Sequence, residues 1–372
     1  MQIQRHPITA MENTADAELL SLHFGSVGTG KKIYIQAALH ADEVPGLLVA
    51  QFLRKELLQL ESAGLIRGEI VLVPAANPLG LSQALMGVPF GRFDFTTGIN
   101  FNREFENITP SLLGLIAPLL GDDEQSNARL IREYARKAVA NIVTKTNADE
   151  LKKILLGLAI DADIVLDLHC DNEAVMHLYT STPFKDAIKP LASLMGAHAV
   201  LISPNTGESP FDETCSRLWL DLAAHFNDKF PIPDACFSVT VELRGERDVN
   251  YELAQADAMA IINFLATSGC IEKVVPELPE SLCQPTPLEG VEPVLAPHSG
   301  IVVFKKELGE DVLAGELLAD LIDPTTGTTT AVCASVSGRF FARTAHRHLL
   351  RGMNIGKIAG RDAFRTGKLM SP

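Results

Sequence analysis

The sequence places side chains that can bind a metal ion directly after short apolar segments. His40 and Glu43 follow the apolar run 33–39, and His169 follows the run 164–168. A histidine and a glutamate three residues apart project from one side of a turn or first helical turn. Two imidazoles and one carboxylate suit Zn²⁺, and three protein ligands leave a position open for a catalytic water. We therefore predict one zinc ion per chain, held by His40, Glu43 and His169.

The His-x-x-acid spacing alone is weak evidence, because ten histidines and 46 acidic residues in 372 positions give about one such match by chance. A second match, His225 with Asp228, lies in an amphipathic helical pattern and is interpreted as a solvated helix face. The position of His40 at the end of a predicted strand favours the first match as a metal site. In open α/β sheets, ligands bind beyond the carboxyl ends of the strands. His169 taken alone could equally be a buried core histidine, but His40, His169 and Glu242 all occupy such strand ends.

Glu242, which follows the run 238–241, is the candidate general base. It would take a proton from the attacking water and give it to the leaving amine. Burial is expected to raise its pKa and a nearby cation to lower it. Asp167, two residues before His169, is expected to point to the opposite face of the strand, so we interpret it as a supporting or structural group and not as a ligand.

Two arginines follow the run 69–74 and are expected on the same side of the sheet. Arg92 is the candidate for stabilising negative charge on the substrate carbonyl oxygen. Arg103, preceded by Asn102, is the candidate for binding a substrate carboxylate, which a guanidinium can hold through two hydrogen bonds. For each arginine, an ordinary surface position is the alternative.

Alternating apolar runs and helical patterns predict the architecture that positions these residues. The runs predict buried strands, and the amphipathic patterns between them predict helices, which together indicate an α/β fold with a mixed or mainly parallel sheet flanked by helices. The predicted strands are 33–39, 69–74, 164–168 and 238–241, and the predicted helices start at Gly46, Asn127, Asp149, Ser216 and Glu252.

A change of composition near residue 271 predicts three parts: a catalytic domain over 1–270, a Pro-rich linker over 271–292 and a small all-β domain over 293–372. Two half-repeats start at Ala296 and Ala334. In each, a Ser-Gly pair precedes an apolar strand, and a second glycine follows at Gly315 or Gly352. Two such units can close into a small barrel or sandwich, and an unrelated all-β appendage is the alternative.

Composition limits the classes of partner. The formal net charge of −14 disfavours nucleic acid and anionic membranes. Six scattered cysteines suit a reducing compartment. The N-terminal segment lacks the pattern of a signal peptide, and no apolar run is long enough to span a membrane. We expect a cytoplasmic protein that acts on a small molecule. The sequence leaves open whether the protein forms a homo-oligomer.

Four motifs resemble those of the succinylglutamate desuccinylase/aspartoacylase family, relatives of the zinc carboxypeptidases. They are HADEVPG, NFNREF, DLHC and TVELRG, which occur in that order within residues 33–265. The resemblance implies a zinc-carboxypeptidase-like domain that hydrolyses an N-acyl amino acid or a related amide. It implies that His169 is the third zinc ligand, that Glu242 is catalytic, and that Asn102 and Arg103 bind the substrate carboxylate.

The C-terminal part resembles the lipoyl/biotinyl-like barrel of some family members. Carrier domains present a lysine on the hairpin between the half-repeats. Here that hairpin, IDPTTGTTTAV, has none, so we expect no covalent cofactor. The barrel is expected to pack beside the active site or at a subunit contact.

The chain departs from the family pattern at several positions. Ala41 replaces the usual glycine, Asn100 the usual aspartate and Phe101 the usual leucine, and residues 105–148 resemble an insertion. Arg244 follows the glutamate motif where small residues are usual. We interpret it as a contact to an acidic substrate, or as a partner of Glu246 or Asp248.

Three further functions stay open from the sequence. A carboxypeptidase acting on peptides would use the same residues, and so would an esterase. A non-catalytic binding module on the same scaffold is the alternative from outside the enzyme class.

Overall fold

The computed structural model describes residues 1–9, 17–226 and 229–369. Its centre is a nine-stranded mixed sheet, and the four predicted strands form its parallel core as β4, β3, β7 and β11. The spatial order is β1 (Gln2–Ile8), β2 (Ala17–Gly25), β4 (Gly68–Val73), β3 (Lys31–Ala37), β7 (Ile164–Asp171), β11 (Phe237–Gly245), β9 (His177–Ser181), β10 (Ala199–Ser203) and β12 (Pro285–Pro287).

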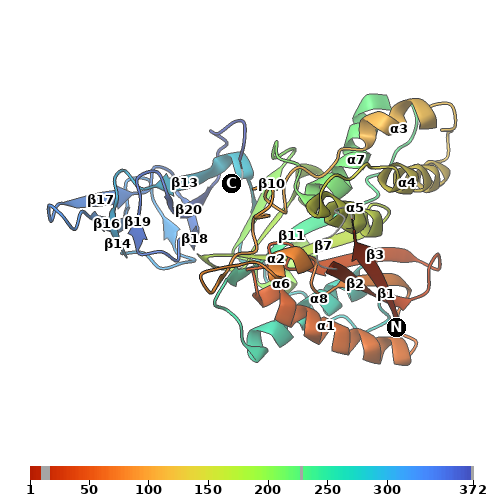
Figure 1. Ribbon diagram of the computed structural model, residues 1–372, viewed down its shortest axis with the longest axis horizontal. Coiled ribbons are helices and arrows are strands. Elements are labelled where there is room, and N and C mark those ends of the chain that lie inside the picture. The colour runs from red at the N-terminus through yellow and green to blue at the C-terminus, as the bar shows by residue number, and fades with distance from the viewer. Residues whose placement is uncertain (10–16, 227–228, 370–372) are drawn as a thin grey trace.

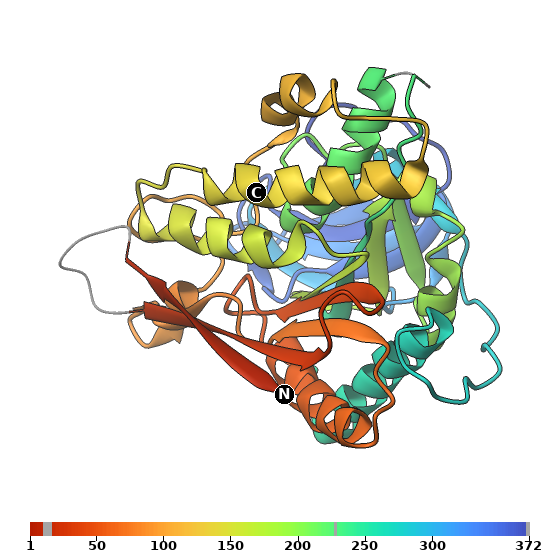
Figure 2. The same cartoon turned by 90° about the vertical axis from the view of Figure 1, so that its right-hand side faces the viewer.

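Helices cover both faces of this sheet (Figures 1 and 2). One apolar core lies between the sheet and α1, α6 and α8, and a second lies between the sheet and α3, α4, α5 and α7. The helices are α1 (Pro45–Ser62), α2 (Pro78–Leu81), α3 (Thr109–Ile116), α4 (Glu124–Ala140), α5 (Asn147–Ala159), α6 (Lys189–Met195), α7 (Phe211–Phe226) and α8 (Tyr251–Thr267).

The five predicted helices correspond to α1, α4, α5, α7 and α8. The 105–148 segment holds α3, α4 and the start of α5, which pack on the same face as α7. His225 lies exposed in the last turn of α7, as a solvated helix face requires, and Asp228 lies outside the described residues.

The C-terminal part forms two antiparallel sheets. Their strands are β13 (Val291–Leu295), β14 (Gly300–Phe304), β15 (Asp311–Val312), β16 (Leu317–Ile322), β17 (Thr329–Cys333), β18 (Gly338–Arg343), β19 (His348–Leu349) and β20 (Asn354–Gly360). The two half-repeats have the same strand order, β14-β15-β16 and β18-β19-β20. Each short middle strand pairs with the first strand of the other half: β15 with β18, and β19 with β14. Gly315 and Gly352 both have φ near +85° in equivalent turns.

The Pro-rich segment predicted as a linker is partly structured. Residues 285–287 form the edge strand β12, which pairs with β10, and β13 begins at Val291. Short edge strands tolerate proline because one side of the strand needs no ladder hydrogen bonds.

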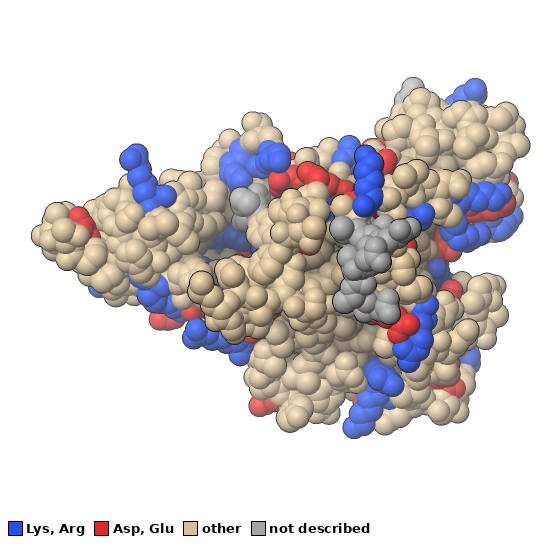
Figure 3. All heavy atoms as spheres, viewed as in Figure 1, with Lys and Arg blue, Asp and Glu red and all other residues tan. Residues whose placement is uncertain are grey.

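Within the described residues, no helix is both long enough and apolar enough to cross a membrane. On the face seen in Figure 3, Lys and Arg side chains are scattered among acidic and uncharged ones.

Candidate metal centre and active site

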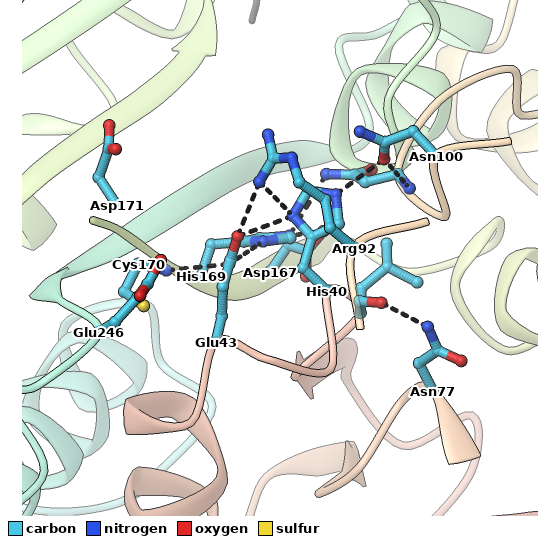
Figure 4. A network of polar contacts seen from close by, with 12 residues as sticks. His40, Glu43, Asn77, Arg92, Asn100, Asp167, His169, Cys170, Asp171 and Glu246 are labelled. Carbon is cyan, nitrogen blue, oxygen red and sulfur yellow. Dashed lines mark hydrogen bonds and ion pairs between the residues drawn. The ribbon is translucent and has the colours of Figure 1, made fainter. Parts of the chain in front are cut away.

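His40, Glu43 and His169 meet at the carboxyl ends of β3 and β7 (Figure 4). After β3 the chain turns through Ala38, whose φ of 59° lies in the left-handed region, and Pro45 begins α1. One Glu43 oxygen lies 2.8 Å from Nδ1 of His40, and the other lies 2.7 Å from Nδ1 of His169. All three side chains are buried, and their ligand atoms lie within 4.8 Å of one another. The group can therefore hold one metal ion.

The second nitrogen of each histidine has its own partner. Nε2 of His40 lies 2.8 Å from Oδ1 of Asn100, and Nε2 of His169 lies 3.0 Å from Oδ2 of Asp167. Such partners fix the tautomer and orientation of metal-binding histidines, leaving Nδ1 to face the ion. The donor set thus fits Zn²⁺, for which two histidines and one glutamate form a known catalytic ligand set.

The expected direction of Asp167 is wrong. Side chains two residues apart on a strand share a face, so Asp167 points to the same side as His169 and contacts it. Its interpretation as a supporting group agrees with this contact. Asp167 is itself held by Gln36, whose Nε2 donates to its Oδ1 at 2.9 Å, and Tyr34 donates to Gln36 at 2.8 Å. This chain of side chains is wholly buried.

The surroundings set the protonation of the three candidate ligands. Burial, helped by the charge of Arg92, lowers the pKa of His40 to about 4, so this imidazole is neutral at pH 7. Burial alone would raise the pKa of Glu43, but the two histidines outweigh it and hold the pKa well below its ordinary value. Burial also opposes a charge on His169, yet Asp167 and Glu43 raise its pKa. His169 must therefore lose a proton to bind a metal.

Glu242 lies on β11, the strand beside β7. In the parallel ladder it is the direct partner of His169. Its Oε2 is buried and has no hydrogen-bond partner among the described residues. Burial, followed by the negative charge of Glu43, raises its pKa to about 8. Without a metal this carboxyl group is therefore mainly protonated at pH 7, and a bound cation would lower its pKa again. An unsatisfied carboxyl oxygen beside a metal-ligand group then suits a general base, because its partner would be the reacting water.

Arg92 reaches the ligand group from the loop after α2. Its Nη1 lies 3.1 Å from Oε1 of Glu43 and 3.2 Å from Nδ1 of His40. The preceding residue, Gly91, accepts a hydrogen bond from the backbone of Ala41. A Cβ at Gly91 would lie 2.6 Å from Cβ of Ala41, and one at Gly80 would lie 2.9 Å from it. These two glycines make the room that alanine in place of the usual glycine requires.

Asn102 and Arg103 are buried next to the group. Nδ2 of Asn102 lies 3.3 Å from Nε2 of His169, and its Oδ1 accepts from the backbone of Phe211 at the start of α7. Arg103 donates to the carbonyl of Asn102 and lies 3.6 Å from Glu208. The structure thus places Asn102 against the metal-ligand group and Arg103, also buried, directly beside Asn102.

Arg244 is directed elsewhere. It has φ of 67°, and the ladder between β11 and β7 shifts register between Glu242 and Gly245. The guanidinium forms a two-pronged ion pair with Asp257 of α8. The partners Glu246 and Asp248 proposed from the sequence are therefore wrong, and a role in substrate binding stays a prediction.

The C-terminal part packs beside the site through β8 (Glu173–Ala174), which pairs with β18. Glu173 forms ion pairs with Arg343 and Arg347, and Lys357 pairs with Asp171, two residues beyond His169. Sequence reasoning missed Lys357 and Asn100 as neighbours of the site.

Comparison with known proteins assigns the family. The profile of the succinylglutamate desuccinylase/aspartoacylase catalytic domain matches residues 29–268. The chain belongs to this family. Family members are hydrolases, so the chain is placed among enzymes of that class. No curated protein matches the sequence.

Solved structures agree with this assignment over nearly the whole chain. A family protein from Shewanella amazonensis SB2B is 26% identical, with a TM-score of 0.84 over 96% of this chain and 98% of that one. A family protein from Shewanella frigidimarina NCIMB 400 is 24% identical, with a TM-score of 0.83 over 96% of this chain and 97% of that one. The product-bound ectoine utilization protein EutE (DoeB) from Ruegeria pomeroyi is 16% identical, with a TM-score of 0.62 over 93% and 90%. The structures at 24% and 16% identity show that the fold is shared.

Proposed function

We propose that this protein is a zinc-dependent hydrolase that cleaves the amide bond of N-acylated amino acids. The observation that carries the proposal is the buried His40–Glu43–His169 group with Glu242 on the adjoining strand. Zinc, when bound, supplies a Lewis acid for the carbonyl group and lowers the pKa of a coordinated water.

Glu242 takes the proton of the attacking water and passes it to the amine nitrogen as the amide bond breaks. Its Oε2 needs no rearrangement for this step, because it is not engaged by another described residue. Arg92, which reaches Glu43 and His40, stabilises the negative charge that develops on the carbonyl oxygen.

Asn102 and Arg103 bind the carboxylate of the amino-acid part. Glu208 lies beside the guanidinium of Arg103 and fixes its position before the substrate arrives. Both residues are buried, which strengthens a charge-assisted hydrogen bond relative to one in water.

The partner is a small molecule and not nucleic acid or a membrane. The C-terminal sheets form a lipoyl/biotinyl-like barrel without a carrier function, since the turn between β16 and β17 has no lysine. The six cysteines are all free, which supports a reducing compartment such as the cytoplasm.

The test is a substrate screen with the zinc-loaded protein. A panel of N-acetyl, N-succinyl and N-formyl amino acids is compared with dipeptides, with Glu242→Gln as the blank. We expect release of free amino acid from at least one N-acyl substrate and none above background with the variant. Hydrolysis of dipeptides alone would instead identify a carboxypeptidase, and hydrolysis of matching esters alone an esterase.

A further inference from the structure

An apolar hairpin projects from the loop that carries Arg92. Its strands are β5 (Ala84–Leu85) and β6 (Val88–Pro89), joined by Met86 and Gly87. Residues 75–91 contain no Asp, Glu, Lys, Arg or His, in a chain that is 21% charged. We call residues 81–90 the apolar hairpin. Its exposed side chains are Leu81, Leu85, Met86, Val88 and Phe90, and Met86 is 98% exposed.

The backbone at the base of this hairpin is fixed by one side chain. Nε2 of Gln83 donates to the carbonyls of Phe90 and Phe93, and its Oε1 accepts from the backbone of Phe95. The rings of Phe90 and Phe95 lie 6.0 Å apart. The apolar side chains are therefore displayed to solvent on an ordered support, and such a patch on a folded protein marks a binding surface.

The hairpin is also attached to the metal-ligand loop. Gly91, directly after it, accepts a hydrogen bond from Ala41 at 3.0 Å. Gly80, directly before it, approaches the same alanine so closely that a Cβ would lie 2.9 Å from the Ala41 methyl. Both ends of the hairpin thus lie against Ala41, the residue directly after His40.

The difference in exposure between the two arginines indicates the direction in which a bound substrate would lie. The side chain of Arg103 is 9% exposed, whereas that of Arg92 is 33% exposed. With the carboxylate at Arg103 and the carbonyl oxygen at Arg92, the remaining acyl group extends outward from Arg92. The residues just before Arg92 form the apolar hairpin, whose large apolar side chains are exposed, as Arg92 partly is, whereas Arg103 is buried.

We propose that the apolar hairpin binds the acyl group of the substrate, so that this enzyme prefers N-acyl amino acids whose acyl chain is apolar and longer than acetyl. This inference rests on the proposed function. A charged acyl group such as succinyl would find no opposite charge on the hairpin, whereas each buried methylene would add hydrophobic stabilisation.

The test compares N-acetyl, N-butanoyl, N-hexanoyl and N-octanoyl derivatives of one accepted amino acid. For the wild type we expect kcat/KM to rise by up to about fourfold for each methylene that becomes buried. The double variant Leu85→Ser, Met86→Ser should reduce the octanoyl-to-acetyl ratio by about tenfold or more. Val27→Ser is the control, because Val27 is also apolar and 79% exposed but precedes β3, at the end of the strand away from the site.

A second measurement separates substrate binding from subunit contact. Far-UV circular dichroism and light scattering should show the same fold and the same molar mass for both variants and the wild type. If the double variant does not fold, Met86→Ser alone replaces it, since that side chain contacts solvent. Turnover of the acetyl substrate with no rise along the series, or a changed molar mass in the hairpin variant, would overturn the inference and leave the proposed function standing. If no member of the series is hydrolysed, both the inference and the proposed function are overturned.

Discussion

Glu242 and His169 are direct partners on the parallel strands β11 and β7. Paired residues of a parallel ladder present their side chains to the same face of the sheet. The candidate general base and one candidate metal ligand are therefore positioned by backbone hydrogen bonds of the buried sheet and not by a mobile loop. A site of this kind is held in its reactive geometry before substrate arrives.

Replacing Glu242 by glutamine should lower kcat by about 10²–10⁴-fold, because the amide cannot accept the proton of the attacking water. Zinc content should not change, since Glu242 is outside the ligand group. Steady-state kinetics and metal analysis of the purified variant check both expectations. Glu246→Gln is the control: this nearby carboxylate is exposed and bonds to Asn172. A loss of less than about tenfold in Glu242→Gln would remove it from the mechanism.

Asn100 and Asp167 should influence metal affinity without touching the ion. Asn100→Ala and Asp167→Ala each remove the partner of one histidine Nε2. Loss of such a partner typically costs about 10–100-fold in metal affinity or activity. Competition with a chromophoric zinc chelator measures the dissociation constant. Unchanged affinity in both variants would mean that these contacts do not orient the histidines.

Arg92 and Arg103 should affect different kinetic constants. Arg92→Ala removes a group that acts mainly on charge formed during reaction, so kcat should fall by about 10²–10³-fold. Arg103→Ala removes a contact made by bound substrate and should mainly raise KM. Kinetics on one N-acyl amino acid and on the matching amide without a carboxylate would separate them. The Arg103 effect should disappear with the second substrate; an equal effect on both would contradict its role.

Asp212, in the first turn of α7, should make stability depend on pH. Burial, followed by the charge of Asp167, raises its pKa to about 7. The folded state therefore keeps a proton that the unfolded chain loses near pH 4. The free energy of unfolding should fall as the pH rises between these values, by ~1.4 kcal/mol per pH unit at most.

Asp212→Asn cannot titrate at this position and should remove this fall. The stability of the variant relative to wild type should therefore be higher at about pH 8 than at about pH 5. Urea unfolding at both pH values measures the difference. An exposed carboxylate, Asp122→Asn, provides the comparison. The same stability gap at both pH values would show that Asp212 is ionised in the fold.

Much of this site could be predicted from strand ends. The apolar runs correspond to the four central parallel strands, whose buried residues give the clearest signal, and His40, His169 and Glu242 follow them. The edge strand β1 and its neighbour β2 carry more polar sequences and were not predicted. Helix α3 is short and was also missed.

Contacts that depend on tertiary geometry could not be read from spacing. The pairing of Arg244 with Asp257 follows from a shifted ladder and a left-handed backbone, which strand alternation does not predict. Lys357 meets Asp171 across 186 residues of sequence. The direction of Asp167, by contrast, could have been predicted, because residues two apart on a strand share a face.

The most direct test of the central claim is metal content measured together with activity. Zinc is measured in the purified wild type and in His169→Ala, before and after dialysis against a chelator, with hydrolysis of an accepted N-acyl amino acid followed in the same samples. We predict one zinc per wild-type chain, loss of zinc and activity together on chelation, recovery of both when zinc is added back, and neither in His169→Ala. Full activity in wild-type protein that holds no stoichiometric metal would contradict the account.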